Sequence, residues 1–306
     1  MSARYVLLPD EGAPALLGPV PDGVEVEIWS GQGPPPSAAG EVGFWVPPFL
    51  SAGGLSDAVA ALPALEVVQA LSAGVDAFVG QMPSGVVLCD GRGVHGSSTA
   101  EWVLTAILAS VREFPRFVLA QAEHRWDRRL TDDLADKRAL VIGAGDVGEA
   151  IRRRLEPFEV DVTMAARRER PGVQPVSALP ALLGEADIVV VVVPLTPATR
   201  HLIDAAFLAR MHDGALLVNA ARGPVADTDA ITAELKSGRL RAALDVTAPE
   251  PLPPDHPLWS VPGLLLTPHV GGSVRAFPRR AYALVRAQVG RWAAGEPLLN
   301  VVSDGY

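Results

Sequence analysis

The sequence has a single cysteine, Cys89, among its 306 residues. One cysteine cannot form an internal disulfide, so we expect a reducing, cytoplasmic compartment. The chain also lacks an excess of basic residues, because 26 Lys and Arg stand against 35 Asp and Glu, a formal net charge of −9. A nucleic acid or an anionic membrane surface attracts basic proteins, so this balance argues against both kinds of partner.

Long apolar runs and metal-ligand spacings are absent as well. No run approaches the ~18 apolar residues of a transmembrane helix, and Pro9-Asp10-Glu11 interrupts the N-terminus before a signal peptide could form. The six histidines show no HxxxH pair and no neighbouring cysteine pair, so we expect no metal site. The remaining composition is typical of a globular protein of about two domains.

The most informative stretch is Ala139–Gly148, which reads ALVIGAGDVG. A short apolar run precedes Gly143-x-Gly145-x-x-Gly148, and a helical pattern follows. In such a strand, turn and helix the glycines allow a tight turn and a close approach to a pyrophosphate, whose charge the helix N-terminus stabilises. The stretch predicts a dinucleotide site, and an ordinary βα turn is the alternative.

Strands alternate with helical segments along most of the chain. This rhythm predicts parallel sheets covered by helices on both faces, and therefore an α/β protein. We predict strands at residues 5–8, 24–29, 42–46, 66–70, 86–89, 139–142, 159–164, 187–193, 215–219, 241–246 and 263–266. We predict helices at residues 55–62, 98–116 (capped by Ser97 or Ser98, with Val103, Ile107 and Val111 buried), 204–211 and 227–236.

The residue after the second strand of the nucleotide-binding core selects the cofactor. An acidic side chain there binds the ribose 2′-hydroxyl of NAD, whereas an arginine fits the 2′-phosphate of NADP. Ala166 stands where the acid would be expected, and Arg167 and Arg168 follow. A guanidinium binds phosphate by bidentate, charge-assisted contacts, so we expect NADP(H) in preference to NAD(H). The alternative is a solvated charge cluster, which Glu169 and Arg170 extend.

Three polar residues, Arg222, Glu250 and His269, each follow one of the last three predicted strands. The carboxyl ends of parallel strands meet at one edge of a sheet, where ligands bind. Proline or glycine flanks each of the three and restricts its backbone. We therefore interpret them as a candidate active site.

Two segments of the first domain are weaker candidates. Leu71–Asp76 follows a predicted strand, and its small residues could offer backbone N–H groups to an anion, although spacing alone favours a plain turn. The glycine-rich joint Asp90–Gly96 is typical of a crossover between domains. Its Arg92 and His95 would lie near a cleft, although a lone loop histidine is more often solvated.

Over essentially its full length the chain resembles the D-isomer-specific 2-hydroxyacid dehydrogenases. The resemblance implies two Rossmann-like or flavodoxin-like domains with the active site in the cleft between them, usually assembled as a homodimer through the nucleotide domain. The substrate domain would span 1–95, completed by 274–306 with a helix at 273–294, and the dinucleotide-binding domain would span 96–273. The motifs that carry the resemblance are Leu65–Asp76, Gly143–Gly148, Val193–Asp204, Val218–Gly223, Ala243–Pro254 and Thr267–Gly272.

The resemblance also implies residue roles. His269 would give a proton to the substrate carbonyl oxygen as hydride arrives from the nicotinamide, with Glu250 favouring the protonated ring. Arg222 would bind the substrate carboxylate and polarise the carbonyl. The implied substrate contacts in the first domain are Ala73, Gly74, Arg92 and His95. The implied cofactor contacts are Gly143, Gly145, Asp146, Val147, Gly148, Arg167, Arg168, Val193, Pro194, Thr199, Ala220, Asp245 and Gly271.

The expected activity is the NADPH-dependent reduction of a small 2-oxo acid, of the glyoxylate or hydroxypyruvate type, to the D-2-hydroxy acid. With the chain ending at Tyr306, we expect no C-terminal regulatory domain of the kind many phosphoglycerate dehydrogenases carry, which weakens a role in serine biosynthesis. The alternative is a dinucleotide-sensing, corepressor-like interaction protein on the same fold. The intact Arg222, Glu250 and His269 favour an enzyme, because a sensor needs no proton donor.

Overall fold

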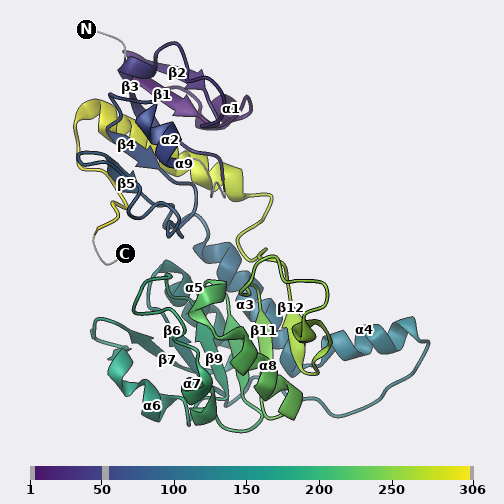
Figure 1. Cartoon of the computed structure of the whole chain (residues 1–306). Helices are drawn as coiled ribbons and strands as arrows, with labels where there is room; N and C mark the ends of the chain where they lie inside the picture. The colour runs from purple at the N-terminus through teal and green to yellow at the C-terminus, as the bar shows by residue number, and fades with distance from the viewer. Residues whose placement is uncertain (1–3, 50–54, 304–306) are drawn as a thin grey trace. The chain divides into compact units, whose positions relative to one another are not determined.

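The computed structural model describes residues 4–49 and 55–303. They divide into two compact units (Figure 1). Unit 1 consists of the described residues up to His95 together with those from Arg275 onward, and unit 2 is Gly96–Val274. Each unit is built on one sheet whose strands are all parallel, so the predicted class, two α/β domains with parallel sheets, is confirmed.

Unit 1 has a five-stranded sheet in the order β2-β1-β3-β4-β5. Successive residues of a strand point to opposite faces, so Val6 and Leu8 pack with α9 while Leu7 packs with α2. The strands are β1 (Arg4–Leu8), β2 (Val24–Ile28), β3 (Val42–Trp45), β4 (Val67–Gln69) and β5 (Val87–Cys89), and the helices are α1 (Ala13–Leu17), α2 (Leu55–Ala60) and α9 (Phe277–Ala294).

Unit 2 has a seven-stranded sheet in the order β12-β11-β10-β9-β6-β7-β8. The chain order reverses between β6 and β9, and doubly wound sheets bind their ligands at such a switch point. The strands are β6 (Arg138–Ile142), β7 (Asp161–Ala166), β8 (Val173–Pro175), β9 (Ile188–Val191), β10 (Leu216–Asn219), β11 (Arg241–Leu244) and β12 (Leu264–Leu266). The helices are α3 (Gly96–Val111), α4 (Phe114–Ala122), α5 (Asp146–Leu155), α6 (Leu179–Leu182), α7 (Ala205–Arg210) and α8 (Thr228–Ser237).

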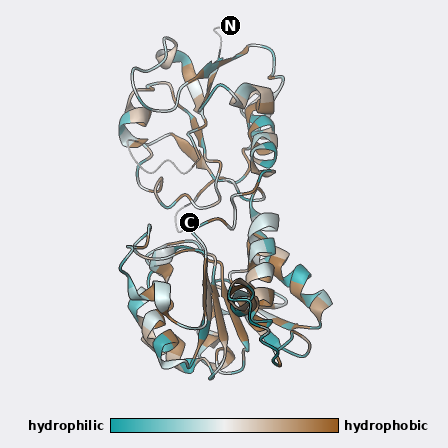
Figure 2. Cartoon of the chain, turned by 90° about the vertical axis from the view of Figure 1, so that its right-hand side faces the viewer, coloured by the Kyte–Doolittle hydropathy of each residue, from teal (hydrophilic) through white to brown (hydrophobic). Residues whose placement is uncertain are grey.

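Hydrophobic residues are concentrated in the strands of this sheet, as the brown colour in Figure 2 shows. The valine run of β9 is fully buried, because helices cover both faces of a central parallel strand. No helix among the described residues is long and apolar enough to span a lipid bilayer.

The predicted helix at 98–116 is wrong at its end. Helix α3 stops at Val111, Glu113 adopts a left-handed φ of 52°, and α4 begins at Phe114 with Pro115 in its first turn. Proline cannot donate the backbone hydrogen bond that a continuing helix needs, whereas the first turn of a new helix tolerates it. The predicted buried stripe of α3, which includes Val103 and Ile107, is confirmed.

The predicted cap of α3 is also wrong. The helix already begins at Gly96, so Ser97 and Ser98 lie in its first turn, and the Ser97 hydroxyl accepts a hydrogen bond from Arg154 at 2.8 Å. The C-terminal helix begins at Phe277, four residues later than predicted. The short elements α1, β8 and α6 were not predicted, because segments of three to five residues carry little periodic signal.

Candidate active site

The glycine-rich turn joins β6 to α5. Gly143 adopts a φ of 115°, and a Cβ atom on Gly148 would overlap the carbonyl oxygen of Gly143. A Cβ atom on Gly145 would meet no atom within 4 Å, so open space remains beside the N-terminus of α5. Asp146 and Val147 are the first two residues of that helix. The turn therefore fits the predicted phosphate cradle.

Three arginines follow β7, and one of them contacts this turn. Strand β7 ends at Ala166, and Arg167 and Arg168 follow it as exposed residues. Arg170 donates a hydrogen bond from its guanidinium to the carbonyl of Ala144 within the glycine-rich turn. From the sequence alone, Arg170 was interpreted only as an extension of a charge cluster. Its signal was already present, since it is a third arginine within four residues of the strand end.

The loop after β9 is held by Thr199. Its hydroxyl donates a hydrogen bond to the carbonyl of Pro194 at 2.6 Å and accepts one from the N–H of Thr196 at 2.8 Å. Val193, which directly precedes Pro194, packs on the hydrophobic core of unit 2. The three predicted cofactor contacts of this loop therefore belong to one tied segment at the carboxyl end of β9.

The predicted catalytic residues follow three neighbouring strands, as expected. Arg222 follows β10, Glu250 follows β11 and His269 follows β12, and the three strands are adjacent and parallel. A Cβ atom on Gly223 would overlap the carbonyl of Thr247, so the turn carrying Arg222 packs against the segment leading to Glu250.

Ala220 and Arg222 have further contacts within this turn. The Ala220 N–H donates to the carbonyl of Val191 at 3.2 Å, which extends the pairing of β10 with β9. Arg222 donates from Nη1 to the carbonyl of Ala221 at 2.9 Å. Both contacts hold the turn at the carboxyl edge of the sheet.

Glu250 and His269 are in direct contact. The Nδ1 atom of His269 lies 2.6 Å from Oε1 of Glu250, and both side chains are partly exposed. An ionised carboxylate can only accept a hydrogen bond, so Glu250 selects the form of the His269 ring that has a proton on Nδ1. The Nε2 atom is then the one that can exchange a proton with a ligand.

The loop that carries His269 is bound to Asp245. The Asp245 carboxylate accepts hydrogen bonds from the Thr267 hydroxyl at 2.6 Å, the Val270 N–H at 2.8 Å and the Gly271 N–H at 2.8 Å. The family resemblance implied that Asp245 and Gly271 contact the cofactor, with Asp245 at the nicotinamide end. Their shared role in this loop was missed, because their hydrogen bonds join residues more than twenty positions apart.

In unit 1, the turn with Ala73 and Gly74 is supported by His95. The His95 ring is buried, stacks on Phe277 with the ring centroids 4.9 Å apart, and places Nε2 3.2 Å from the carbonyl of Leu71. It is therefore a packed residue rather than a solvated loop histidine. Its contact with substrate, and that of the turn, stay predictions.

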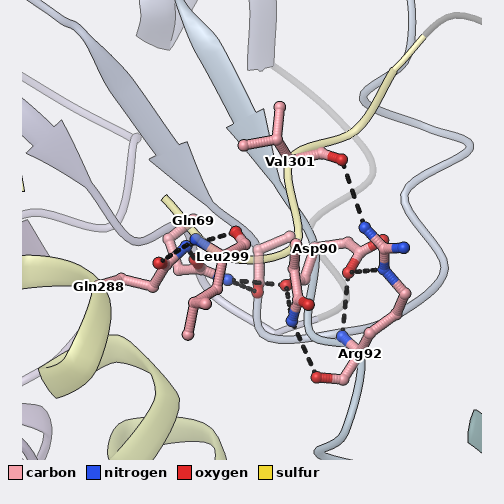
Figure 3. A network of polar contacts seen from close by, with 8 residues as sticks. Gln69, Asp90, Arg92, Gln288, Leu299 and Val301 are labelled. Carbon is pink, nitrogen blue, oxygen red and sulfur yellow. Dashed lines mark hydrogen bonds and ion pairs between the residues drawn. The ribbon is translucent and has the colours of Figure 1, made fainter. Parts of the chain in front are cut away.

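The Arg92 side chain forms hydrogen bonds to two residues of unit 1 (Figure 3). Its Nε donates to Asp90 at 2.9 Å, and its Nη2 donates to the carbonyl of Val301 at 3.3 Å. Burial raises the pKa of Asp90, and the hydrogen bonds from Arg92 oppose that shift. Arg92 thereby ties the joint to the C-terminal segment, and its predicted contact with substrate stays a prediction.

The described residues contain no group of three or more His, Cys, Asp or Glu suited to hold a metal ion. The site instead combines a dinucleotide cradle with an acid–base pair on one sheet edge.

Residues 104–271, more than half of the chain, match the family profile described as D-isomer specific 2-hydroxyacid dehydrogenase, NAD binding domain. The chain belongs to this family. The resemblance inferred from the motifs is confirmed.

Known members of the 2-hydroxyacid dehydrogenase family match over different lengths. The D-3-phosphoglycerate dehydrogenase of Archaeoglobus fulgidus is 33% identical over 228 residues, which are 72% of this chain and 43% of that protein. The chain therefore spans less than half of that relative.

Two solved structures match throughout. A D-isomer specific 2-hydroxyacid dehydrogenase from Xanthobacter autotrophicus, in complex with NADPH and MES, is 35% identical with a TM-score of 0.86, covering 99% of this chain and 98% of that one. The NADPH-dependent glyoxylate/hydroxypyruvate reductase of Sinorhizobium meliloti, in complex with NADP and sulfate, is 28% identical with a TM-score of 0.83, over the same shares.

Proposed function

We propose that this 2-hydroxyacid dehydrogenase reduces a small 2-oxo acid to the D-2-hydroxy acid with NADPH. The observation that carries the proposal is the 2.6 Å contact between His269 Nδ1 and Glu250 Oε1. The pair lies at the carboxyl edge of the sheet, where the glycine-rich turn also follows its strand. A dinucleotide sensor without catalysis is not favoured, because binding alone requires no acid–base pair.

The side chains of unit 2 would divide the chemistry between them. When bound in reduced form, the nicotinamide supplies a hydride to C2 of the oxo acid. His269 would transfer the proton from Nε2 to the carbonyl oxygen, while Glu250 balances the charge of the protonated ring. Arg222 would bind the substrate carboxylate and stabilise the negative charge that develops on the carbonyl oxygen.

The preference for NADP(H) is part of the proposal. Ala166 places no carboxylate at the end of β7, and Arg167 and Arg168 follow directly. Arg170 adds a third guanidinium beside the glycine-rich turn. A 2′-phosphate would meet positive charge here without a carboxylate at the strand end, which favours NADPH over NADH. The Xanthobacter and Sinorhizobium relatives were crystallised with NADPH and NADP.

Glyoxylate and hydroxypyruvate are the proposed substrates, by analogy with the named activity of the Sinorhizobium relative. The test is a panel of 2-oxo acids, from these two to branched and aromatic ones, with NADPH consumption followed by absorbance. We expect the highest kcat/KM with the smallest acids. Turnover of the bulky acids alone would overturn the substrate proposal, and no turnover with any acid would overturn the activity.

A homodimer is the proposed assembly. Helix α4 and the segment after it expose large apolar side chains, among which Trp126 is 94% and Leu130 is 96% exposed. Exposed apolar groups of this size indicate a protein interface. Light scattering should give twice the chain mass, and the double substitution W126S and L130S should shift the protein toward the monomer. A wild-type monomer would contradict the proposal.

A further inference from the structure

We propose that Asp245 is a positioning residue that holds His269 in place for proton transfer, acting through the loop Thr267–Gly271. The inference rests on the proposed function, since it concerns the same acid–base pair. It assigns Asp245 a role in the protein's own loop, in addition to any contact that it makes with a cofactor.

The hydrogen bonds of Asp245 surround His269 on both sides along the chain. Its Oδ1 accepts from the Thr267 hydroxyl and the Val270 N–H, and its Oδ2 accepts from the Gly271 N–H. The Asp245 carbonyl accepts the N–H of His269 itself at 2.7 Å. Four hydrogen bonds from the loop therefore end on one residue, which is 4% exposed.

The backbone of His269 needs this support. His269 adopts a φ of 54°, in the left-handed region that side chains other than glycine rarely occupy. Such a conformation persists where the surrounding structure holds it. The hydrogen bonds to Asp245 on either side of His269 provide that constraint and thereby set the direction of the imidazole toward Glu250.

The close packing at Gly271 is a second, independent sign of the same role. A Cβ atom at this position would lie 2.9 Å from Oδ2 of Asp245 and 3.5 Å from the ring of Trp102 on α3. The loop is thus held between the carboxylate and the helix. A residue larger than glycine would push the loop away from Asp245.

The shape-matched substitution D245N is the direct test. An amide has one acceptor oxygen and a donor NH2 group, so it leaves either the Gly271 N–H or the Thr267 and Val270 donors facing another donor. The loop should then move by about 1 Å, and a misplacement of this size can cost on the order of 100-fold in rate. We expect kcat to fall about 100-fold, with KM for the oxo acid and Kd for NADPH changed less than about threefold.

Two further variants calibrate this result. T267V removes one of the three carboxylate contacts and should lower kcat about tenfold, whereas T267S keeps the hydroxyl and should restore the rate. D204N changes an aspartate that caps α7, whose Oδ1 accepts the N–H of Phe207 at 2.8 Å, and should leave kcat unchanged. It controls for the loss of stability that an Asp to Asn change causes in the same unit.

A spectroscopic measurement separates this inference from the proposed activity. In 15N-histidine-labelled protein, the Nδ1–H of His269 should give a strongly downfield proton signal, assigned by its loss in H269Q. We expect D245N to lose this signal while D204N keeps it, whether or not any oxo acid is turned over. A retained signal with unchanged kcat would overturn the inference, as would a fall in kcat matched by an equal loss of NADPH affinity.

Discussion

The two units follow the same doubly wound plan but use their buried polar residues differently. In unit 1 these residues hold the fold together: the Gln288 amide donates to Gln69 at 2.8 Å and to the carbonyl of Leu299 at 2.8 Å (Figure 3). In unit 2 the buried Asp245 holds the loop that carries His269, one member of the partly exposed acid–base pair.

The reason for the difference lies in chain continuity. Unit 2 is one uninterrupted stretch, whereas unit 1 is completed by α9 and the C-terminal segment, which come from the far end of the sequence. That segment has to be fixed to β5, and Cys89 pairs with Val301 for this purpose. The comparison predicts that substitutions in unit 1 change stability and that those in unit 2 change chemistry.

The largest effect should come from H269Q in unit 2. Removing a positioned general acid costs 10²- to 10⁴-fold in rate, so kcat for oxo acid reduction should fall by about 10³. The thermal midpoint should stay close to the wild-type value, because the ring is partly exposed. A variant that kept more than a tenth of the wild-type kcat would remove His269 from the chemistry.

A smaller loss is expected for E250Q. The neutral amide can still accept the Nδ1–H of His269, but it no longer balances the positive charge of a ring that carries both protons. We expect kcat for oxo acid reduction to fall about 30-fold, with KM for NADPH changed little. Steady-state kinetics measure both constants, and a variant with the wild-type kcat would contradict the role.

The double substitution R167A and R168A should weaken the binding of NADPH and leave the binding of the oxo acid unchanged. Each lost charge-assisted contact weakens binding of a 2′-phosphate, so KM for NADPH should rise about tenfold or more while KM for NADH changes little. R153A, on the exposed side of α5, is the matched control. Equal kcat/KM values for NADPH and NADH in the wild-type protein would remove the proposed preference.

In unit 1, Q288L should lower stability without changing catalysis. Gln288 is fully buried, and its loss leaves Gln69 and Leu299 without their partner, which costs about 2 kcal/mol. Chemical denaturation measures the change, and Q174L at an exposed position of β8 is the control. A destabilised protein with unchanged kcat would sharpen the comparison of the units, and an unchanged denaturation midpoint would break it.

The smallest effect concerns the thiol of Cys89. Burial raises its pKa to about 11, so little reactive thiolate is present near neutral pH. Alkylation by iodoacetamide should be slow in the folded protein at neutral pH. As the pH is raised toward the pKa, the thiolate fraction rises, so the rate should increase about tenfold for each pH unit. Fast labelling at neutral pH would show that β5 and the C-terminal segment do not stay paired.

Most of the strands and the fold class were predictable because their signals are local. The valine run of β9 and the glycine pattern at Gly143 each specify an element within a few residues. The cap of α8 by Asp227 and its end at Gly238 follow equally local rules. The split between α3 and α4 could have been read from Pro115, which the apolar pattern masked.

The sequence by itself determined the parallel sheets, the dinucleotide cradle and the order of Arg222, Glu250 and His269 after successive strands, because each depends on residues close together in the chain. Only the tertiary structure decided that Asp245 holds the His269 loop, that Arg170 reaches the glycine-rich turn and that Arg92 binds Asp90 and the C-terminal segment. These are hydrogen bonds whose partners depend on how distant segments pack, and a linear pattern carries no signal for them.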